Sequence, residues 1–202
     1  MAVAGIGSHA LSADTASAFL LAYSDKAIAE LTAPGVDQSE KEKRFRRLLV
    51  EGFDLPSIGV FILGQYARSV SEEQRKAYLE AFQDAMTQRF LPLFSKHPNE
   101  RLHIVRERIS EADPNSTIVN AQITQPSAPP IKVDWRIRKR NGQYKILDIT
   151  IEGASMAVTL RSDYTAVLAR NNGRIEALTE RLRQKVSEGA FAPDRPIKNL
   201  LN

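Results

Sequence analysis

The chain of 202 residues is 43% hydrophobic and 26% charged, a composition typical of a soluble globular protein with one sizeable core. It contains no cysteine, which excludes disulfide scaffolds, thiolate zinc sites and thiol nucleophiles. The formal net charge of +4 favours acidic partners but is too small to identify nucleic acid as the ligand.

Residues 1–13 are mostly small and apolar and contain Ser8-His9-Ala10 and Leu11-Ser12-Ala13, two small-residue triplets that signal-peptide cleavage tolerates, but they lack a basic n-region and a full apolar h-region. We interpret this stretch as the remnant of a truncated export signal, with a disordered terminus as the alternative. The longest apolar run, Ile58 to Gly64, is too short to span a bilayer.

Hydrophobic residues recur at three- and four-residue steps across residues 14–95, which predicts a mainly helical region. The first two helices are expected from Asp14 to Leu31 and from Asp37 or Ser39 to Gly52. Two more have signals at their starts. Asp54 followed by Pro56 caps a third helix, which is apolar nearly all round. Ser71 and Gln74 form a capping box for a fourth, which Pro92 is expected to end or kink.

Beyond residue 100 the hydrophobic period changes from 3.6 to 2 residues, which indicates β-strands. We predict strands over residues 102–109, 116–124, 131–140 and 143–151. Asn141-Gly142 between the last two specifies a type I′ hairpin. Four consecutive strands with short connections make an antiparallel meander.

Two helices are predicted to close the chain, from Ser155 to about Asn171 and from Arg174 to Glu188. The expected fold class is therefore α+β, with helices packed over one face of a curved four-stranded antiparallel sheet. We expect a single domain over residues 14–190, comprising a helical part (14–95), a sheet (101–152) and C-terminal helices (155–188), followed by a tail at 191–202.

The two-residue turn predicts the register of the last hairpin. One face then holds the pairs Ile137–Ile146, Trp135–Asp148 and Val133–Thr150. The other holds Arg138–Lys145, Arg136–Leu147, Asp134–Ile149 and Lys132–Ile151. Neither face is cleanly polar, so both are expected to be covered in part.

The sequence lacks the residue patterns of common catalytic and metal sites. His9, His97 and His103 are too scattered for a metal site or a base-and-nucleophile pair, so no metal is expected. Asp148 and Glu152 on one strand would have α-carbons about 13 Å apart, too far for a glycosidase pair. The basic run at 136–140 has no stacking aromatics on the arginine face, which argues against nucleic acid and favours an anionic lipid surface or a protein partner.

Three segments carry further motifs: GVFILGQYARSVSEEQRKAYLEAF, VDWRIRKRNGQYKILDITIEGASM and LRSDYTAVLARNNG. Together they resemble the MlaC family of periplasmic lipid-binding proteins, also called toluene-tolerance auxiliary proteins, over residues 17–188. The matching positions are Leu63, Gly64 and Tyr66; Gln74 and Arg75; Asp148, Glu152, Gly153 and Ser155; and Arg161. The chain departs from the family pattern at Ala67, Thr159-Leu160 and Tyr164, where the family usually has an aromatic residue, Asn-Tyr and Phe.

The resemblance implies a sheet like that of nuclear transport factor 2, wrapped by helices, with acyl chains inserted between the two layers. It implies a periplasmic carrier without enzymatic activity or cofactor, which shuttles phospholipid between inner and outer membranes. The implied partners are an inner-membrane ABC-type transport complex and an outer-membrane lipoprotein complex.

On this reading, apolar residues of the helices and of the last hairpin line a lipid cavity: Phe61, Ile62, Tyr66, Val133, Trp135, Ile137, Met156, Leu160 and Tyr164. Arg161 is expected near the head group at the cavity mouth. Arg136, Arg138 and Lys145 are expected to contact a partner.

Three alternatives remain open. The sequence is also similar to the family branch associated with hopanoid biosynthesis clusters, so a polycyclic triterpenoid is an alternative cargo. A small enzyme on the same fold would need a polar dyad in the cavity, for which Asp148 with Tyr66 or Tyr164 is the candidate. A protein adaptor would have a filled core.

Overall fold

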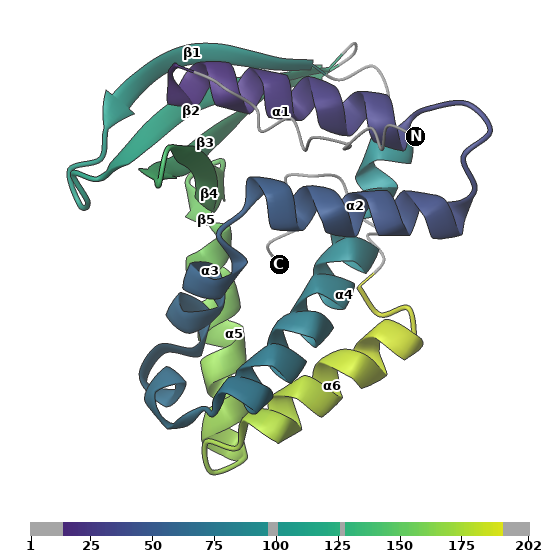
Figure 1. Cartoon of the computed structure of the whole chain (residues 1–202), viewed down its shortest axis with the longest axis vertical. Coiled ribbons are helices and arrows are strands. Elements are labelled where there is room, and N and C mark those ends of the chain that lie inside the picture. Colours follow the sequence, from purple (N-terminus) through teal and green to yellow (C-terminus); the bar gives the residue numbers. More distant parts are fainter. Residues whose placement is uncertain (1–13, 97–100, 126–127, 192–202) are drawn as a thin grey trace, which may run out of the picture.

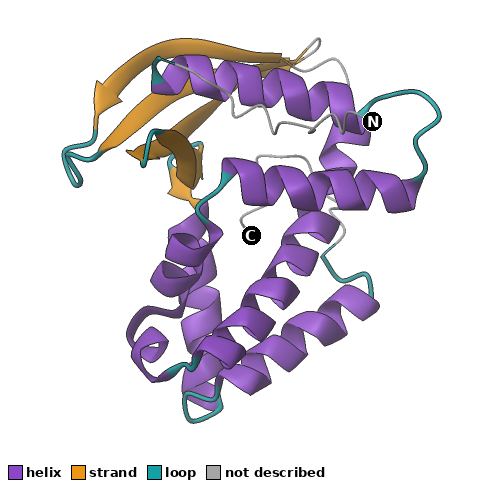
Figure 2. Cartoon of the chain, viewed as in Figure 1, coloured by secondary structure: helices purple, strands orange, loops and turns teal. Residues whose placement is uncertain are grey.

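The computed structural model describes residues 14–96, 101–125 and 128–191 of the chain, in which helices, a sheet and two further helices follow one another (Figures 1 and 2). This confirms the predicted α+β class. The helices are α1 (Ala16–Leu31), α2 (Gln38–Gly52), α3 (Leu55–Leu63), the 3₁₀ helix η1 (Gly64–Ser69), α4 (Glu72–Lys96), α5 (Met156–Arg170) and α6 (Ile175–Ser187). The predictions for residues 1–13, for His97 and for the tail beyond residue 191 lie outside the described residues.

The predicted capping residues begin their helices. The Asp54 carboxylate accepts a hydrogen bond from the Ser57 N–H at 3.1 Å at the start of α3. Ser71 and Gln74 form the reciprocal pair of a capping box before α4. Pro92 does not end the helix, because α4 continues past it to Lys96. The lost backbone hydrogen bond is offset by packing beyond the proline, where the Phe94 ring lies edge-on to Phe45 with centroids 5.9 Å apart.

The strands are β1 (Arg101–Ile109), β2 (Ser116–Gln125), β3 (Ala128–Arg140), β4 (Gln143–Ile151) and β5 (Ala154–Ser155), paired antiparallel in chain order. The predicted meander is confirmed, and β5 was not foreseen. It exists because Glu152 and Gly153 both adopt positive φ, 49° and 88°, and fold the chain back along β4. Asn141 and Gly142, with φ of 50° and 76°, form the predicted turn between β3 and β4.

The register of the β3–β4 hairpin differs from the prediction beyond its first pairs. Ile137–Ile146 and Arg138–Lys145 are confirmed, but a bulge leaves Leu147 without a partner, so that Arg136 lies opposite Asp148. The remaining predicted pairs are therefore wrong: Trp135–Asp148, Val133–Thr150, Arg136–Leu147, Asp134–Ile149 and Lys132–Ile151. Trp135 instead lies opposite Ile149 and Val133 opposite Ile151. The extra residue reverses the faces of the rest of β4 and turns its apolar residues toward the helices.

The helices form two groups around the sheet (Figure 1). α1 contacts β1, β2 and β3, while α2, α3 and α5 contact β4. α4 packs mainly on α6 and α2, and its Phe90 side chain reaches the strand residues Ile131, Val133 and Ile151. The chain thus encloses the space between the inner face of the sheet and helices α1, α2 and α4. No helix in the described ranges combines the length and apolarity needed to cross a membrane.

Candidate functional site

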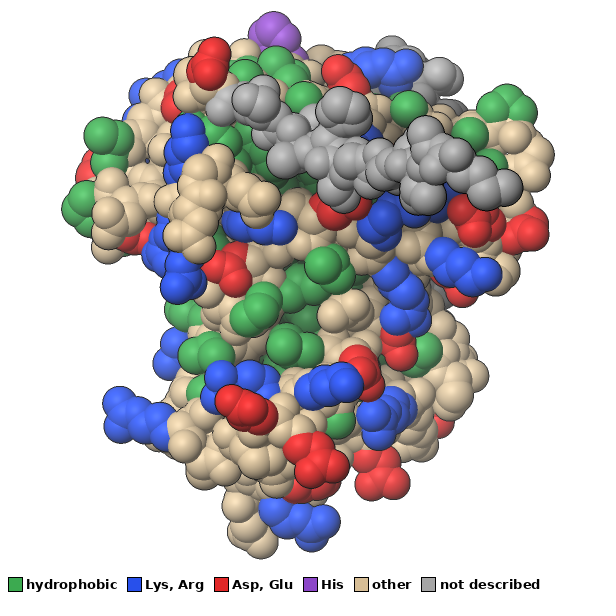
Figure 3. All heavy atoms as spheres, in the orientation of Figure 1, with side chains coloured by type: hydrophobic (Ala, Val, Ile, Leu, Met, Phe, Trp, Pro, Cys, Tyr) green, Lys and Arg blue, Asp and Glu red, His purple; other side chains and the backbone are tan. Residues whose placement is uncertain are grey.

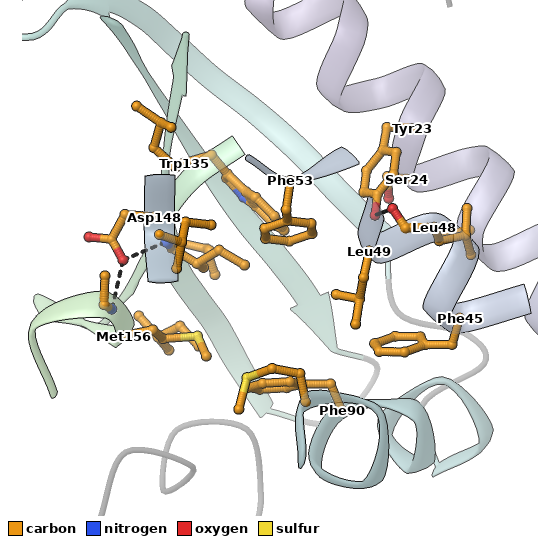
Figure 4. Close-up of a pocket in the computed structure, with 18 of the residues that line it drawn as sticks. Tyr23, Ser24, Phe45, Leu48, Leu49, Phe53, Phe90, Trp135, Asp148 and Met156 are labelled. Atoms are coloured by element: carbon orange, nitrogen blue, oxygen red, sulfur yellow. Dashed lines mark hydrogen bonds between the residues drawn. The ribbon is translucent and has the colours of Figure 1, made fainter. Parts of the chain in front are cut away.

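An apolar cavity of about 280 Å³ lies between the sheet and the helices. Its wall contains residues of α1 to α5 and of β1 to β4 (Figure 4). The volume is nearly twice that of an apolar protein cavity of ~150 Å³ that stays dry and takes up benzene. The space can therefore hold a segment of hydrocarbon.

The α1 side of the wall depends on a close contact between Tyr23 and Gly52. The Tyr23 hydroxyl donates a hydrogen bond to the Leu48 carbonyl at 2.9 Å, so its polar end is satisfied and its ring faces apolar neighbours. A Cβ on Gly52 would lie 2.3 Å from Tyr23 Cζ, so only glycine at this position admits the ring. Burial, and secondarily Glu51 and Glu30, raises the pKa of the Tyr23 phenol above its ordinary value.

The segment between α2 and α3 places Phe53 in the wall. Phe53 pairs with Ile146 in an isolated parallel bridge, in which the Asp54 N–H donates to the Ile146 carbonyl at 3.0 Å. Lys145 fixes the same junction, because its Nζ donates to the carbonyls of Val50 at 3.0 Å and Glu51 at 2.6 Å. A cation at the last turn also suits the negative end of the helix dipole. Figure 4 shows Phe53 in the same space as Trp135 and Leu49.

The α5 side of the wall is positioned by Asp148. Its Oδ1 accepts hydrogen bonds from the N–H groups of Ile149 at 2.9 Å and Ala157 at 3.0 Å, and its Oδ2 accepts one from Ser155 Oγ at 2.6 Å. Ser155 Oγ in turn accepts from the Val158 N–H at 3.1 Å and caps α5. The carboxylate therefore holds the first turn of α5 against β4. None of these hydrogen bonds of Asp148 involves Tyr66 or Tyr164, the two residues considered as its partners in a catalytic dyad.

The chemistry of the wall is almost wholly apolar. Its residues are aliphatic or aromatic except Ser24, Arg101 and Asp148. Trp135 adds an indole Nε1 that is shielded from water and has no hydrogen-bond partner among the described residues. Because a polar ligand would leave its own hydrogen bonds unmade here, the cavity suits hydrocarbon.

Four of the nine residues predicted to contact lipid line the cavity: Val133, Trp135, Met156 and Leu160. The other five are not part of its wall. Ile62 and Ile137 are fully buried core residues. The Tyr164 ring packs edge-on against Tyr78 and Phe82, and the Tyr66 ring packs against Gly173, where an added Cβ would lie 3.0 Å from Tyr66 Cδ1.

Phe61 and Arg161 contact each other outside the cavity wall. The Arg161 guanidinium lies over the Phe61 ring at 4.9 Å from its centroid. It also covers Gly64, where an added Cβ would lie 3.2 Å from Arg161 Nη2. Gly64 has a φ of 58° and ends α3, so this contact joins the α3–η1 corner to α5.

The three predicted partner-contact residues have different surroundings. Arg138 Nη2 donates to Asp113 Oδ2 at 2.5 Å and lowers the pKa of that carboxyl. Lys145 caps α2, as described above. Arg136 is half-buried and has no hydrogen-bond or ion-pair partner among the described residues.

Much of the wall comes from residues that were not predicted to touch lipid. α1 and α2 contribute Tyr23, Phe45, Leu48 and Leu49, α4 contributes Phe82, Met86, Phe90 and Phe94, and β4 contributes Leu147, Ile149 and Ile151. The helical residues belong to apolar stripes visible in the sequence. A stripe shows which face of a helix is buried but not whether that face meets another side chain or a void. The β4 residues were assigned to the opposite face because the bulge has no clear sequence signal.

Fold and site together define an α+β protein with an apolar cavity between an antiparallel sheet and its covering helices. The family model of the MlaC protein matches residues 22–184, and the chain belongs to that family. It is 24% identical over 172 residues to the intermembrane phospholipid transport system binding protein MlaC of Haemophilus influenzae, covering 81% of this chain and 78% of that protein.

A solved structure shares the fold. It is a phospholipid-binding protein from Ralstonia solanacearum in complex with a phospholipid, with a TM-score of 0.68 and 16% sequence identity. The match covers 84% of this chain and 98% of that one. These similarities support the family resemblance seen in the sequence motifs and give no support to the hopanoid-associated branch.

Proposed function

We propose that the protein is a lipid carrier that shelters the tails of a phospholipid in the cavity between its sheet and helices. The observation that carries the proposal is the apolar wall, in which Ser24, Arg101 and Asp148 are the residues with polar or charged side chains apart from the ring substituents of Tyr23 and Trp135. Asp148 is already committed to the start of α5. The wall can therefore bury the hydrocarbon of a lipid tail. Its described residues provide no acid–base pair for catalysis.

The hydrophobic effect explains why a carrier is needed. A two-tailed phospholipid has roughly 30 methylenes, and at about 0.8 kcal/mol each their exposure to water costs on the order of 20 kcal/mol. Such a molecule does not cross an aqueous compartment unaided at a useful rate. An apolar cavity replaces the bilayer interior at nearly equal free energy, so that loading and release are close to balanced.

The size of the cavity indicates what loading requires. A volume of about 280 Å³ lies at the lower limit of ligand pockets, which span ~300–1,000 Å³. It accommodates part of one acyl chain, and two full tails need more room. We infer that the sheet and the helices move apart during loading. Hydrophobic side chains gather on the surface where α2 meets α3 and α4, as Figure 3 shows, and we place the entrance there.

The named relatives support phospholipid as the cargo, since one is a phospholipid transport binding protein and another was solved with phospholipid bound. By this relationship we propose a periplasmic location, with an inner-membrane ABC-type complex and an outer-membrane lipoprotein complex as partners between which the lipid is carried. The tails enter the cavity and the head group stays at its mouth. We propose that Arg101, an exposed residue of the wall, contacts the head group, whereas the position of Arg161 over Phe61 gives that role no support.

The proposal is tested by purifying the protein without detergent and examining it by native mass spectrometry and organic extraction. The expected result is co-purified phospholipid. Ala27 on α1 is 5% exposed and lines the cavity, whereas Ala29 on the same helix is exposed. Ala27→Phe should therefore reduce the bound lipid, and Ala29→Phe should leave it unchanged, with circular dichroism showing that both variants fold.

Each outcome of the extraction bears on the proposal. A triterpenoid in place of phospholipid would replace the cargo but keep the carrier. A protein that purifies empty, and that takes up no phospholipid from vesicles, would contradict the proposal and indicate an adaptor.

A further inference from the structure

Three arginines lie together on the outer face of the sheet, the face opposite the cavity. Val119 and Val133 are buried on the inner face, and side chains alternate along each strand. Arg108, Arg136 and Arg138 therefore lie on the outer face. Arg108 pairs with Ile118, which pairs in turn with Arg136, so the two arginines flank one residue across adjacent strands.

The spacing lets the three side chains reach one point. Strands lie about 4.8 Å apart, which puts the α-carbons of Arg108 and Arg136 about 10 Å apart. Residues two apart on one strand are about 7 Å apart, which is the separation of Arg136 and Arg138. Arginine side chains from such positions can converge on a group only a few ångströms across.

The carboxylates around this group already have partners. Asp113 pairs with Nη2 of Arg138. Asp134 accepts from Asn120 Nδ2 at 2.6 Å, and Asp148, opposite Arg136 in the sheet, caps α5. Arg108 and Arg136 consequently have no hydrogen-bond or ion-pair partner within the described part of the chain.

The middle arginine is also partly shielded from water. The Nε atoms of Arg136 and Arg138 are buried and have no partner among the described residues. Leaving a charged donor half-buried and unpaired costs free energy, and this cost is recovered when an anion binds. Lys145, which lies opposite Arg138 on this face, differs because its Nζ already donates to two carbonyls at the end of α2.

We propose that Arg108, Arg136 and Arg138 form a binding site for a phosphate group on the outer face of the sheet, separate from the lipid cavity. Guanidinium forks bind phosphate oxygens in pairs, and a tetrahedral oxyanion presents enough oxygens for more than one fork. Asp113 accepts only from Nη2 of Arg138, so the buried Nε of that guanidinium can still donate to a phosphate oxygen. The phosphate comes from a lipid head group exposed at a membrane surface or from a small soluble phosphate.

The site is tested on the whole protein with two probes, inorganic phosphate and vesicles of phosphatidylglycerol. Titration with inorganic phosphate should shift the side-chain N–H resonances of Arg136 in two-dimensional NMR spectra. Arg136→Gln and Arg108→Gln should each weaken phosphate binding about tenfold, the loss expected for one charge-assisted contact. Arg140→Gln is the matched control, because Arg140 lies on the same strand face, is exposed and ends β3.

Binding of both probes would show that the site takes lipid head groups, and binding of inorganic phosphate alone would show a soluble ligand. Equal losses in Arg136→Gln and Arg140→Gln would overturn the proposal, since they indicate a diffuse charge effect. If the protein bound neither inorganic phosphate nor the vesicles but bound an acidic peptide, the proposal would also be overturned. Lipid co-purification should be the same in the wild type and Arg136→Gln, so this test is independent of the carrier function.

Discussion

The carboxylate of Asp148 accepts a hydrogen bond from the backbone N–H of Ala157 at 3.0 Å and so ties the last long strand to the first turn of α5. The intervening residues make a tight turn in which Glu152 and Gly153 both have positive φ. This corner of the chain therefore joins β4 rigidly to α5. Its role is to hold α5 where Met156 and Leu160 line the cavity.

Asp148→Asn should destabilise the protein by about 1–3 kcal/mol. Asparagine keeps one acceptor oxygen but presents an amide where the second oxygen receives the Ser155 hydroxyl or a backbone N–H. Urea unfolding measures the change, with Asp25→Asn on the exposed side of α1 as a control expected to be neutral. Equal stability of the two variants would show that the joint contributes nothing.

Gly52→Ala should destabilise the protein by about 1–3 kcal/mol, because the added methyl group would lie 2.3 Å from a ring carbon of Tyr23. The ring cannot move without losing the hydrogen bond to Leu48. Gly59→Ala is the control. Its methyl group would lie 2.7 Å from Leu79 Cδ2, the end of a flexible side chain, and alanine gains helix propensity. Thermal unfolding should rank Gly52→Ala well below Gly59→Ala.

Helix boundaries can be predicted from the sequence, whereas a contact such as that of Gly52 with Tyr23 cannot. The helix boundaries follow from Asp54, Ser71 and Gln74, because a cap satisfies backbone donors within three or four residues of itself. From its local sequence, Gly52 is predicted only to end a helix. Its actual constraint is a ring on another helix, 29 residues earlier in the chain, and no local pattern encodes such a contact.

The hairpin shows the same limit. Asn141-Gly142 fixes the turn and the first pairs, because the positive φ values are a local property of these residues. The bulge at Leu147 arises further along, where burying Leu147, Ile149 and Ile151 against the helices outweighs the lost ladder bond. The register error hid the β4 residues of the wall, and five of the nine predicted lipid contacts lie outside the wall because an apolar stripe does not show which face meets a void.

Tyr164→Phe should leave the protein equally stable or slightly more stable. The Tyr164 hydroxyl is buried without a hydrogen-bond partner among the described residues, so its removal relieves a desolvation cost. The ring keeps its edge-on contacts with Tyr78 and Phe82. Tyr23→Phe provides the contrast, because it removes a hydrogen bond to Leu48 and should cost about 1 kcal/mol. A clear destabilisation of Tyr164→Phe in urea would reveal a partner for the hydroxyl.

The protein should lose stability at alkaline pH through its buried tyrosines. Burial raises the pKa of Tyr23, Tyr78 and Tyr164 above the ordinary phenol value. The folded state therefore holds these protons more tightly than the unfolded state. Their contribution is fully present below about pH 10, where both states are protonated, and is lost as the pH rises toward the raised pKa. Urea midpoints measured from neutral to alkaline pH should fall less steeply in Tyr164→Phe than in the wild type, and identical slopes would contradict this account.

Loading with lipid should increase the distance between the sheet and α2. The cavity of about 280 Å³ has room for only part of one acyl chain, so a second tail would have to separate the sheet from the helices. The chain has no cysteine, so two introduced cysteines are the only labelling sites. Val50 on α2 and Val105 on β1 are both exposed, at 53% and 55%, and tolerate a spin label. Electron–electron distance measurements should show a longer separation in lipid-loaded than in delipidated protein. A label pair on Val50 and Glu42, both on α2, should report the same distance in each state, and a constant Val50–Val105 distance would mean that the lipid is held without parting the layers.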